Sequence, residues 1–340
     1  MTAIHNSNAL QAAKKVVRAH HASLDAALPG ESARALAAHT APDWRWMGMH
    51  PFHEITGAEN VARAFWDPLK SALRPLQRRL DLFIAGHNDI DSGASVWVAS
   101  MGHLMGLLDD AWLAIPATGK IAMLRYAEFH RVADNQIAET ALFIDIPHLM
   151  IQAGIDPWPQ ATAMHLVQPG PMNHQGILFD PQAPEEGATT LALINAMIAD
   201  LGTWKLGIPL EDELRRTWHE DMIWWGPAGI GATYTIPRYA QQHAAPFRAG
   251  FANRSTTNHL ARIGEGAFGG FFGWPNFMAN PTGGFMGMPG SETPGPFRVV
   301  DFYRRSGDKL SENWVFIDLL HFWASQGVDV LANATANSQQ

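Results

Sequence analysis

The feature that most constrains this chain is a motif that occurs twice. "ETALFIDIPHLM" (139–150) and "ENWVFIDLLHFW" (312–323) share a Glu, a Phe-Ile-Asp and a His at the same spacing. Other segments match in the same order: "DWRWMG" (43–48) with "DMIWWG" (221–226), and "LRYAEFHR" (124–131) with "FRVVDFYR" (297–304). Similar segments in a conserved order indicate a duplication, in which each copy folds as one unit.

The duplication predicts two domains, at 9–155 and 188–335, joined by a proline-rich linker at 156–187. A chain of 340 residues exceeds a single domain of roughly 100 to 200 residues. A long connection without periodicity is also typical of the region between domains.

Each copy starts with a helix and continues with strands. Apolar residues at helical spacing predict helices over 9–28 and 189–202. The rest of each copy alternates with a period of two and ends in a hairpin that turns at 133–136 or 306–309. Helices followed by a curved antiparallel sheet make an α+β fold. The glycine-rich segment 264–275 is predicted to form one strongly bent strand.

The repeated aspartates, Asp145 and Asp318, end the last strand of each hairpin. Two-residue turns would pair Glu139 with His130 and Glu312 with Tyr303. Each aspartate then lies on the aromatic face of its hairpin, where apolar surroundings would raise its pKa toward a value useful for proton transfer. The alternative is that each aspartate caps the helix that follows it.

Two further carboxylates, Glu128 and Asp301, lie within strands, where a capping role is unavailable. They are candidates for acid–base chemistry, and the alternative is a solvated position or an ion pair with Arg125 or Arg298. His130 and its copy, Tyr303, can both donate a hydrogen bond or a proton.

The chain is rich in large soft side chains, with 13 Trp, 17 Phe and 14 Met but only 4 Tyr. These side chains fit either an ordinary core or a pocket for an apolar or aromatic ligand. The candidate pocket residues are Trp46, Trp224, His50, Trp112, Phe143, Trp314 and Phe316.

Several classes of function are disfavoured. The formal net charge is −8 and no basic stripe exists, so no nucleic-acid partner is predicted. The chain has no cysteine, which excludes disulfides and thiolate catalysis. No apolar run approaches the roughly 18 residues of a membrane span, and a cytoplasmic location is expected. We predict no metal at "HPFHE" (50–54), because the two imidazole rings would lie on different sides of the segment.

Three parts of the sequence resemble the SnoaL-like polyketide cyclase family. They are "WLAIPATGK" (112–120), "YAEFHRVADNQIAE" (126–139), and Asp145 with the "HLMIQAGI" that follows it. The resemblance extends over nearly all of both copies. It implies the nuclear-transport-factor-like, cystatin-like fold: two tandem cone-shaped domains, each with helices packed on a curved antiparallel sheet. The second copy departs from the family pattern, with Tyr303 for the histidine and "GSETPGP" for the Thr-Gly-Lys turn.

In that family the final aspartate acts as general acid and base in an aldol ring closure, without metal or organic cofactor. The resemblance therefore implies this role for Asp145 and Asp318, with His130 as a partner. The leading prediction is a cofactor-independent lyase or isomerase that acts on a hydrophobic carbonyl-containing small molecule by aldol-type cyclisation, isomerisation or elimination. The alternative is a non-catalytic module of the same fold that binds a small ligand or another protein. Assembly into a homo-oligomer is a further open alternative.

Overall fold

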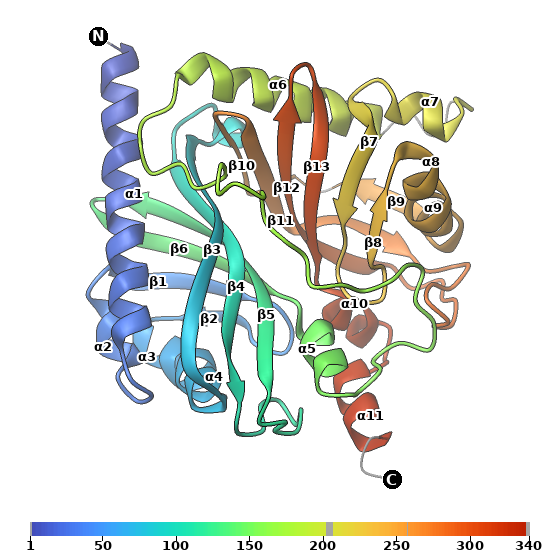
Figure 1. Ribbon diagram of the computed structural model, residues 1–340, viewed down its shortest axis with the longest axis horizontal. Helices are drawn as coiled ribbons and strands as arrows, with labels where there is room; N and C mark the ends of the chain where they lie inside the picture. Colours follow the sequence, from blue (N-terminus) through green and yellow to red (C-terminus); the bar gives the residue numbers. More distant parts are fainter. Residues whose placement is uncertain (1, 202–206, 257, 338–340) are drawn as a thin grey trace. The chain divides into compact units, whose positions relative to one another are not determined.

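The computed structural model describes residues 2–201, 207–256 and 258–337, which form two compact units (Figure 1). Unit 1 runs to Pro157 and also includes Pro169–Pro181 and the residues from Asp329 onward. Unit 2 comprises Trp158–Gln168 and Gln182–Val328. The segment predicted as a linker is therefore divided between the units, and a helix already begins at Pro184 within it.

Unit 1 contains a six-stranded sheet in the order β2-β1-β6-β5-β4-β3. Its strands are β1 (Thr40–Gly48), β2 (His53–Thr56), β3 (Leu73–His87), β4 (Val96–Leu108), β5 (Ile121–Ala133) and β6 (Gln136–Ile144). Its helices are α1 (Thr2–Ala26), α2 (Ser32–Ala37), α3 (Ala58–Val61), η1 (Ala62–Trp66), α4 (Asp67–Ala72), η2 (Asp89–Asp91), α5 (Ile146–Gln152) and α11 (Val330–Asn337). The helix α1 packs on β3 and β4.

Unit 2 contains a seven-stranded sheet in which β10-β11-β12-β13-β7-β8 are consecutive and β9 also pairs with β11. Its strands are β7 (Trp218–Trp225), β8 (Ala232–Tyr234), β9 (Ala252–Thr256), β10 (Ala261–Glu265), β11 (Phe268–Asn280), β12 (Gly295–Ser306) and β13 (Lys309–Ile317). Its helices are α6 (Pro184–Asp200), α7 (Leu210–Leu214), α8 (Ile236–Tyr239), η4 (Ala240–Ala244), α9 (Ala245–Gly250) and α10 (Leu319–Ser325). The helix α6 packs on β10 and β11.

The two sheets have the same topology, which confirms the tandem α+β fold. In each sheet the first strand of the copy pairs in parallel with the last one, β1 with β6 and β7 with β13, and the other pairs are antiparallel. The long strand β3 of unit 1 is replaced in unit 2 by two short strands, β9 and β10, on the same edge of β11. Of the described helices, none is both long and apolar enough to cross a membrane.

The predicted register of both hairpins is wrong by one residue. The two-residue turns are as expected, since Ala133 pairs with Gln136 and Ser306 with Lys309. A β-bulge then follows in each hairpin, so that Arg131 pairs with Glu139. An extra residue in one strand shifts every later pair, and because side chains alternate, it reverses which faces meet. Glu128 and His130 therefore share a face with Leu142 and Thr140, not with Phe143.

The same slip in unit 2 moves Asp301 and Tyr303 away from the face of Trp314 and Phe316. Tyr303 pairs with Asn313, and Asp301 pairs with Val315. The residues on each inner hairpin face are thus a carboxylate, a His or Tyr, and a Thr or Asn from the neighbouring strand. The glycine-rich segment also differs from the prediction: β10 ends at Glu265 and β11 begins at Phe268, so it forms a hairpin and not one bent strand.

A π-helical turn occurs at the same place in both copies, η1 in unit 1 and η4 in unit 2. Each precedes a helix with proline in its first turn, Pro68 or Pro246. Proline lacks the N–H needed for the usual helical hydrogen bond, and π-turns often lie at functional sites. These turns bring Phe65 against Trp46, with ring centroids 5.4 Å apart, and His243 against Trp224, stacked at 4.0 Å.

Candidate active site

Asp145, one of the two repeated aspartates, caps a helix in unit 1. Its Oδ1 accepts a hydrogen bond from the backbone N–H of His148 at 3.1 Å, at the start of α5. Its Oδ2 lies 3.3 Å from Nη1 of Arg125, and both side chains are buried. Burial lowers the pKa of Arg125 to about 10, and the negative charge of Asp145 opposes that shift. Arg125 therefore pairs with Asp145, although the sequence suggested an ion pair between Arg125 and Glu128.

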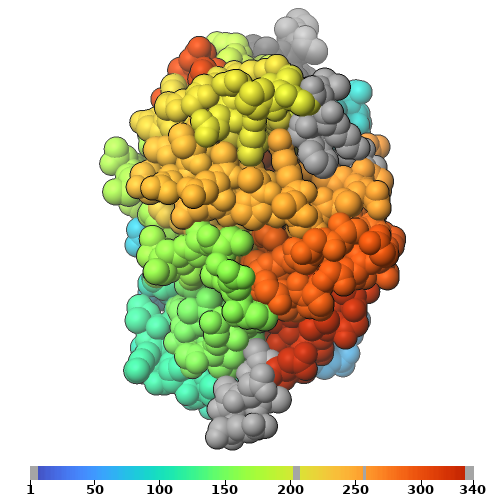
Figure 2. Space-filling view, turned by 90° about the vertical axis from the view of Figure 1, so that its right-hand side faces the viewer, coloured from blue at the N-terminus to red at the C-terminus, as the bar shows by residue number. Residues whose placement is uncertain are grey.

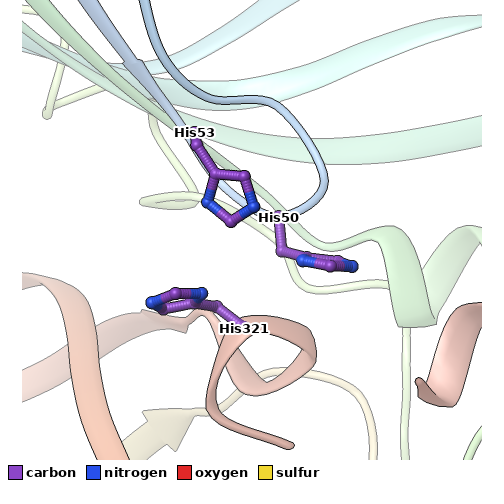
Figure 3. Close-up of side chains that lie close together, drawn as sticks. All are labelled: His50, His53 and His321. Carbon is purple, nitrogen blue, oxygen red and sulfur yellow. The ribbon is translucent and has the colours of Figure 1, made fainter. Parts of the chain in front are cut away.

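Asp318 repeats this arrangement in unit 2. Its Oδ1 accepts from the backbone N–H of His321 (labelled in Figure 3) at 3.2 Å, and its Oδ2 lies 3.6 Å from Nη1 of Arg298. The capping alternative is thus what the structure shows at both positions. The carboxylates that face the helix-covered interior of each sheet are Glu128 and Asp301.

In unit 1, Glu128 is the centre of a buried polar network. Its Oε2 lies 3.0 Å from Nε2 of His21 on α1, 3.0 Å from Nη1 of Arg78 on β3, and 3.3 Å from Oγ of Ser100 on β4. Nε2 of His130 is 3.6 Å away from the same oxygen. Four elements therefore converge on one carboxylate oxygen, and Glu128 is only 2% exposed.

Hydrogen bonds to Thr140 fix the tautomer of His130. Nε1 of Trp44 donates to Oγ1 of Thr140 at 3.0 Å, and Nδ1 of His130 lies 2.9 Å from the same oxygen. An indole can only donate, so the threonine hydroxyl accepts from Trp44 and can donate its own proton to Nδ1 of His130. In the tautomer in which Thr140 donates to Nδ1, the Nε2–H of His130 is directed at Glu128, 3.6 Å away.

Arg78 is the main reason why Glu128 is ionised in this network. Burial alone would raise the pKa of Glu128, but Arg78, together with hydrogen bonds from His130 and His21, holds it well below the ordinary value. Burial is also the main reason why the pKa of His21 falls to about 4 and that of His20 falls well below its usual range. At neutral pH the network therefore contains an ionised Glu128–Arg78 pair, and His20 and His21 are neutral.

His21, Glu128 and His130 could also be considered as metal ligands, because one ligand atom from each lies within 4.8 Å of the others. Two imidazoles and a carboxylate are a set that divalent transition metals accept. However, Arg78 donates to the same oxygen of Glu128 that a metal would use. A cation there would face a buried guanidinium at short range, where like charges repel strongly. The geometry fits an ion-pair network, and a metal would require Arg78 to move away.

Of the histidines of "HPFHE", His50 lies on the turn between β1 and β2, and His53 is the first residue of β2 (Figure 3). The rings of His50 and His53 are 5.4 Å apart, so the expectation that they point to different sides is wrong. Both side chains are half-buried. Between them, Phe52 packs against Trp112 and Phe65, with ring centroids at 6.0 and 5.0 Å. His50 therefore lies at the edge of an aromatic cluster.

In unit 2 the position of Glu128 is occupied by Asp301, which has very different surroundings. Nδ2 of Asn313 donates to Oδ1 of Asp301 at 3.2 Å, and the carboxylate forms no ion pair with any of the residues that the structure describes. Burial raises the pKa of Asp301 to about 7, and hydrogen bonds from Asn313 and Tyr303 oppose this shift only in part. Asp301 is half-buried, unlike Glu128. It can therefore exchange a proton near neutrality.

Aromatic rings surround this carboxyl group. Phe271 pairs with Asp301 across the sheet and lies 5.8 Å from the ring of Tyr303, while Trp218 lies 5.9 Å from Tyr303 on another side. Trp224 pairs with Asn313 and so faces the same interior. In unit 1, Trp46 has the matching position beside Thr140. Both tryptophans thus lie on the face that carries Glu128 or Asp301.

Tyr239 on α8 is a functional candidate that the sequence did not reveal. Its ring lies 5.7 Å from Trp224, and its side chain is half-buried. Burial, followed by the nearby charge of Asp301, raises its pKa. Three of the four tyrosines, Tyr126, Tyr239 and Tyr303, thus lie beside the two interior carboxylates. The scarcity of tyrosine in a chain so rich in Phe and Trp was the signal that could have identified them.

SnoaL-like and NTF2-like proteins are similar to this chain in structure. A protein described as a "Putative SnoaL-like polyketide cyclase" from Jannaschia sp. CCS1 is 20% identical, with a TM-score of 0.32, and the match covers 41% of this chain and 92% of that one. An NTF2-like protein from Burkholderia thailandensis E264 is 23% identical, with a TM-score of 0.31 and coverages of 42% and 95%. TsrD from Streptomyces laurentii is 20% identical, with a TM-score of 0.32 and coverages of 41% and 96%. No protein-family model and no curated protein matches the sequence.

Three of the predicted pocket residues lie away from the interior carboxylates. Phe143 pairs with Ala127, Trp314 with Phe302 and Phe316 with Val300, all on the opposite face of their sheets. The one-residue bulge in each hairpin explains this placement. All three are buried, so they contribute to packing on that face.

Unit 2 also has a surface cleft of about 680 Å³. Three segments line it: residues 160–162, the helical residues Arg238, Gln241, Gln242 and Pro246, and Gly283–Met288 of the loop between β11 and β12. They are exposed on the face shown in Figure 2, in green, light orange and dark orange. Phe285 connects this cleft to the interior, because its ring packs on Phe247 and Phe251 at 5.8 and 5.2 Å.

Proposed function

We propose that this protein is a cofactor-independent acid–base enzyme acting on a hydrophobic carbonyl-containing small molecule, with its chemistry in unit 2. The observation that carries the proposal is Asp301: a half-buried carboxyl group with a pKa of about 7, without an ion pair among the described residues and surrounded by aromatic rings. A general base works best when its pKa lies near the working pH. Perturbed carboxyl groups in apolar clefts are typical of functional sites.

In the proposed reaction, the ionised Asp301 removes a proton from the carbon next to the carbonyl group of the substrate. The electron pair of that C–H bond forms a C=C bond, and the carbonyl π electrons move to the oxygen, which becomes an enolate. The phenol of Tyr239 donates a hydrogen bond to this oxygen, and Tyr303, together with Asn313, holds the carboxyl group of Asp301. Hydrogen bonds to a developing oxyanion lower the barrier most when they are already in place.

The enolate can then add to a second carbonyl group, expel a leaving group or take the proton back at another carbon. Aldol-type cyclisation, elimination and isomerisation therefore share the first step, and the substrate determines which one follows. The protonated Asp301 returns its proton in the last step, so the side chains of this chain are sufficient for the proton transfers.

Unit 1 supports the alternative, non-catalytic function for that copy. Its interior carboxylate, Glu128, is paired with Arg78 and stays ionised, with its neighbours His130 and Tyr126 fully buried. An ion-paired carboxylate with a low pKa is a weak base. We therefore assign unit 1 a structural role, in which the polar network fixes the packing of α1 on the sheet.

The experiment is deuterium loss from α-deuterated 1-tetralone, an aryl ketone, in ordinary water, followed by mass spectrometry. The wild-type protein should accelerate the loss, and Asp301→Asn should slow it by about 10²- to 10⁴-fold, the usual contribution of a positioned base. The matched control is Asp308→Asn, which changes an exposed aspartate in the β12–β13 turn of the same unit and should leave the rate unchanged. Full activity in Asp301→Asn, or no acceleration by the wild type, would contradict the proposal.

A further inference from the structure

We propose that unit 2 binds a substrate with an anionic group, a carboxylate, held by Arg254 at the far end of the same interior from Asp301. This inference rests on the proposed function of Asp301 and adds the chemical class of the substrate: an aromatic or polycyclic keto acid. Three features of Arg254 carry it, namely its position, the lack of an ion pair with any described residue, and its distance from the base.

Arg254 lies on β9 and faces the interior of unit 2. Its guanidinium carbon is 4.3 Å from the ring centroid of Phe277, which pairs across the sheet with Phe297. Side chains alternate along a strand, so Phe297 and Asp301 on β12 share one face. Phe277, and the guanidinium stacked on it, therefore belong to the face that carries Asp301.

The guanidinium of Arg254 forms no ion pair or hydrogen bond with any of the described residues. Its neighbour Arg248 donates to Glu213 at 2.7 Å, and in unit 1 Arg78 pairs with Glu128. Arg254 is half-buried and has a second positive charge, Arg248, nearby, so burial and Arg248 both lower its pKa. A partly desolvated charge without a counterion is costly, and an anionic ligand would remove that cost.

The chemistry of the guanidinium indicates which anion fits. Stacking on Phe277 covers one face of the planar group and leaves its N–H edge free, and that edge matches the two oxygens of a carboxylate. Along β12, four residues separate Asp301 from Phe297, a distance of about 13 Å. Tyr239 is within electrostatic reach of both Asp301 and Arg254. The acid group and the reacting carbonyl should therefore be at opposite ends of a fused-ring skeleton.

The test compares 2-naphthoate with 2-naphthamide, which has nearly the same shape but no charge, by calorimetric titration of the whole protein. The wild type should bind the acid about tenfold more tightly, as expected for hydrogen bonds to a charged group. Arg254→Met should bind the two equally. The matched control is Arg216→Met, which changes an exposed arginine of the same unit that pairs with Asp200 and should keep the preference.

Equal binding of acid and amide by the wild type, or an unchanged preference in Arg254→Met, would overturn the inference. Asp301→Asn separates it from the proposed function: it removes the base but should bind 2-naphthoate at least as tightly as the wild type does. A crystal structure of the wild type with 6-bromo-2-naphthoate gives an answer even if Arg254→Met does not fold. A carboxylate within hydrogen-bond distance of Arg254 supports the inference, and a carboxylate elsewhere contradicts it.

Discussion

Glu128 in unit 1 and Asp301 in unit 2 occupy the same place in the same topology, yet their proton affinities are shifted in opposite directions. The pKa of Glu128 is well below its ordinary value, whereas that of Asp301 is raised to about 7. Burial favours a raised pKa for both groups, so it does not explain why their shifts have opposite signs. The difference is the cation: Arg78 lies 3.0 Å from Glu128, and no described cation pairs with Asp301.

The origin of this difference lies on the neighbouring strands. In unit 1, Arg78 on β3 pairs with Leu104 on β4. The corresponding pair in unit 2 is Thr256 on β9 with Phe277 on β11. A threonine thus replaces the arginine in the sequence. The division of the long β3 into the short strands β9 and β10 accompanies this change. One duplicated carboxylate has become part of a buried ion-pair network, while the other is half-buried and has a pKa suited to proton transfer.

The largest expected effect is on stability, from removing the cation in unit 1. Arg78→Met should lower the free energy of unfolding by about 3–5 kcal/mol, because it leaves Glu128 buried and unpaired. Chemical denaturation measures this loss. The double variant Arg78→Met/Glu128→Gln should recover most of it, because no buried charge is then left without a partner and Asp25, which also pairs with Arg78, is exposed. A loss below about 1 kcal/mol in Arg78→Met would mean that the ion pair does not hold unit 1 together.

The second expected effect is a pH dependence of stability that Asp301 imposes. The folded pKa of about 7 exceeds the unfolded value of about 3.9, so the stability that Asp301 contributes is complete below pH 3.9 and is lost as pH rises through 7. By pH 9 the loss approaches about 4 kcal/mol. The stability difference between Asp301→Asn and the wild type should therefore grow with pH, as measured by denaturation at pH 5, 7 and 9. A difference that stays constant over this range would exclude the raised pKa.

The third effect has the opposite sign and belongs to unit 1. His21 has a folded pKa of about 4, below the unfolded value of about 6.5, so protonation favours the unfolded state and stability is lost as pH falls from 6.5 to 4. The loss amounts to about 3 kcal/mol. In His21→Gln this part of the acid sensitivity should disappear. Denaturation at pH 7 and pH 4.5 checks it, with the half-buried His219→Gln in unit 2 as the control. Equal acid sensitivity of His21→Gln and the wild type would contradict the assignment.

The sequence predicted the duplication, the α+β class and the two-residue turns, because these depend on local patterns and on their repetition. It did not predict the bulge that follows each turn, since Ala138 and Ser311 carry no composition signal, and one extra residue reverses a strand face. It identified Glu128 and Asp301 but not what decides their chemistry. His21 and Arg78 are distant from Glu128 in sequence, and only the folded sheet brings them together.

The smallest expected effect is that of Asp318→Asn, which tests whether a repeated aspartate has the same role as the interior carboxylates. Asp318→Asn keeps an oxygen that can accept from the backbone N–H of His321, and Asn is as good a helix cap as Asp. The variant weakens only the contact with Arg298, which at 3.6 Å is already long, so the loss should be about 1 kcal/mol. Deuterium loss from 1-tetralone should continue at the wild-type rate. If that rate fell as far as in Asp301→Asn, the base would be Asp318 at the end of β13. The resemblance to the cyclase family would then have identified the base correctly, and the geometry around Asp301 would not.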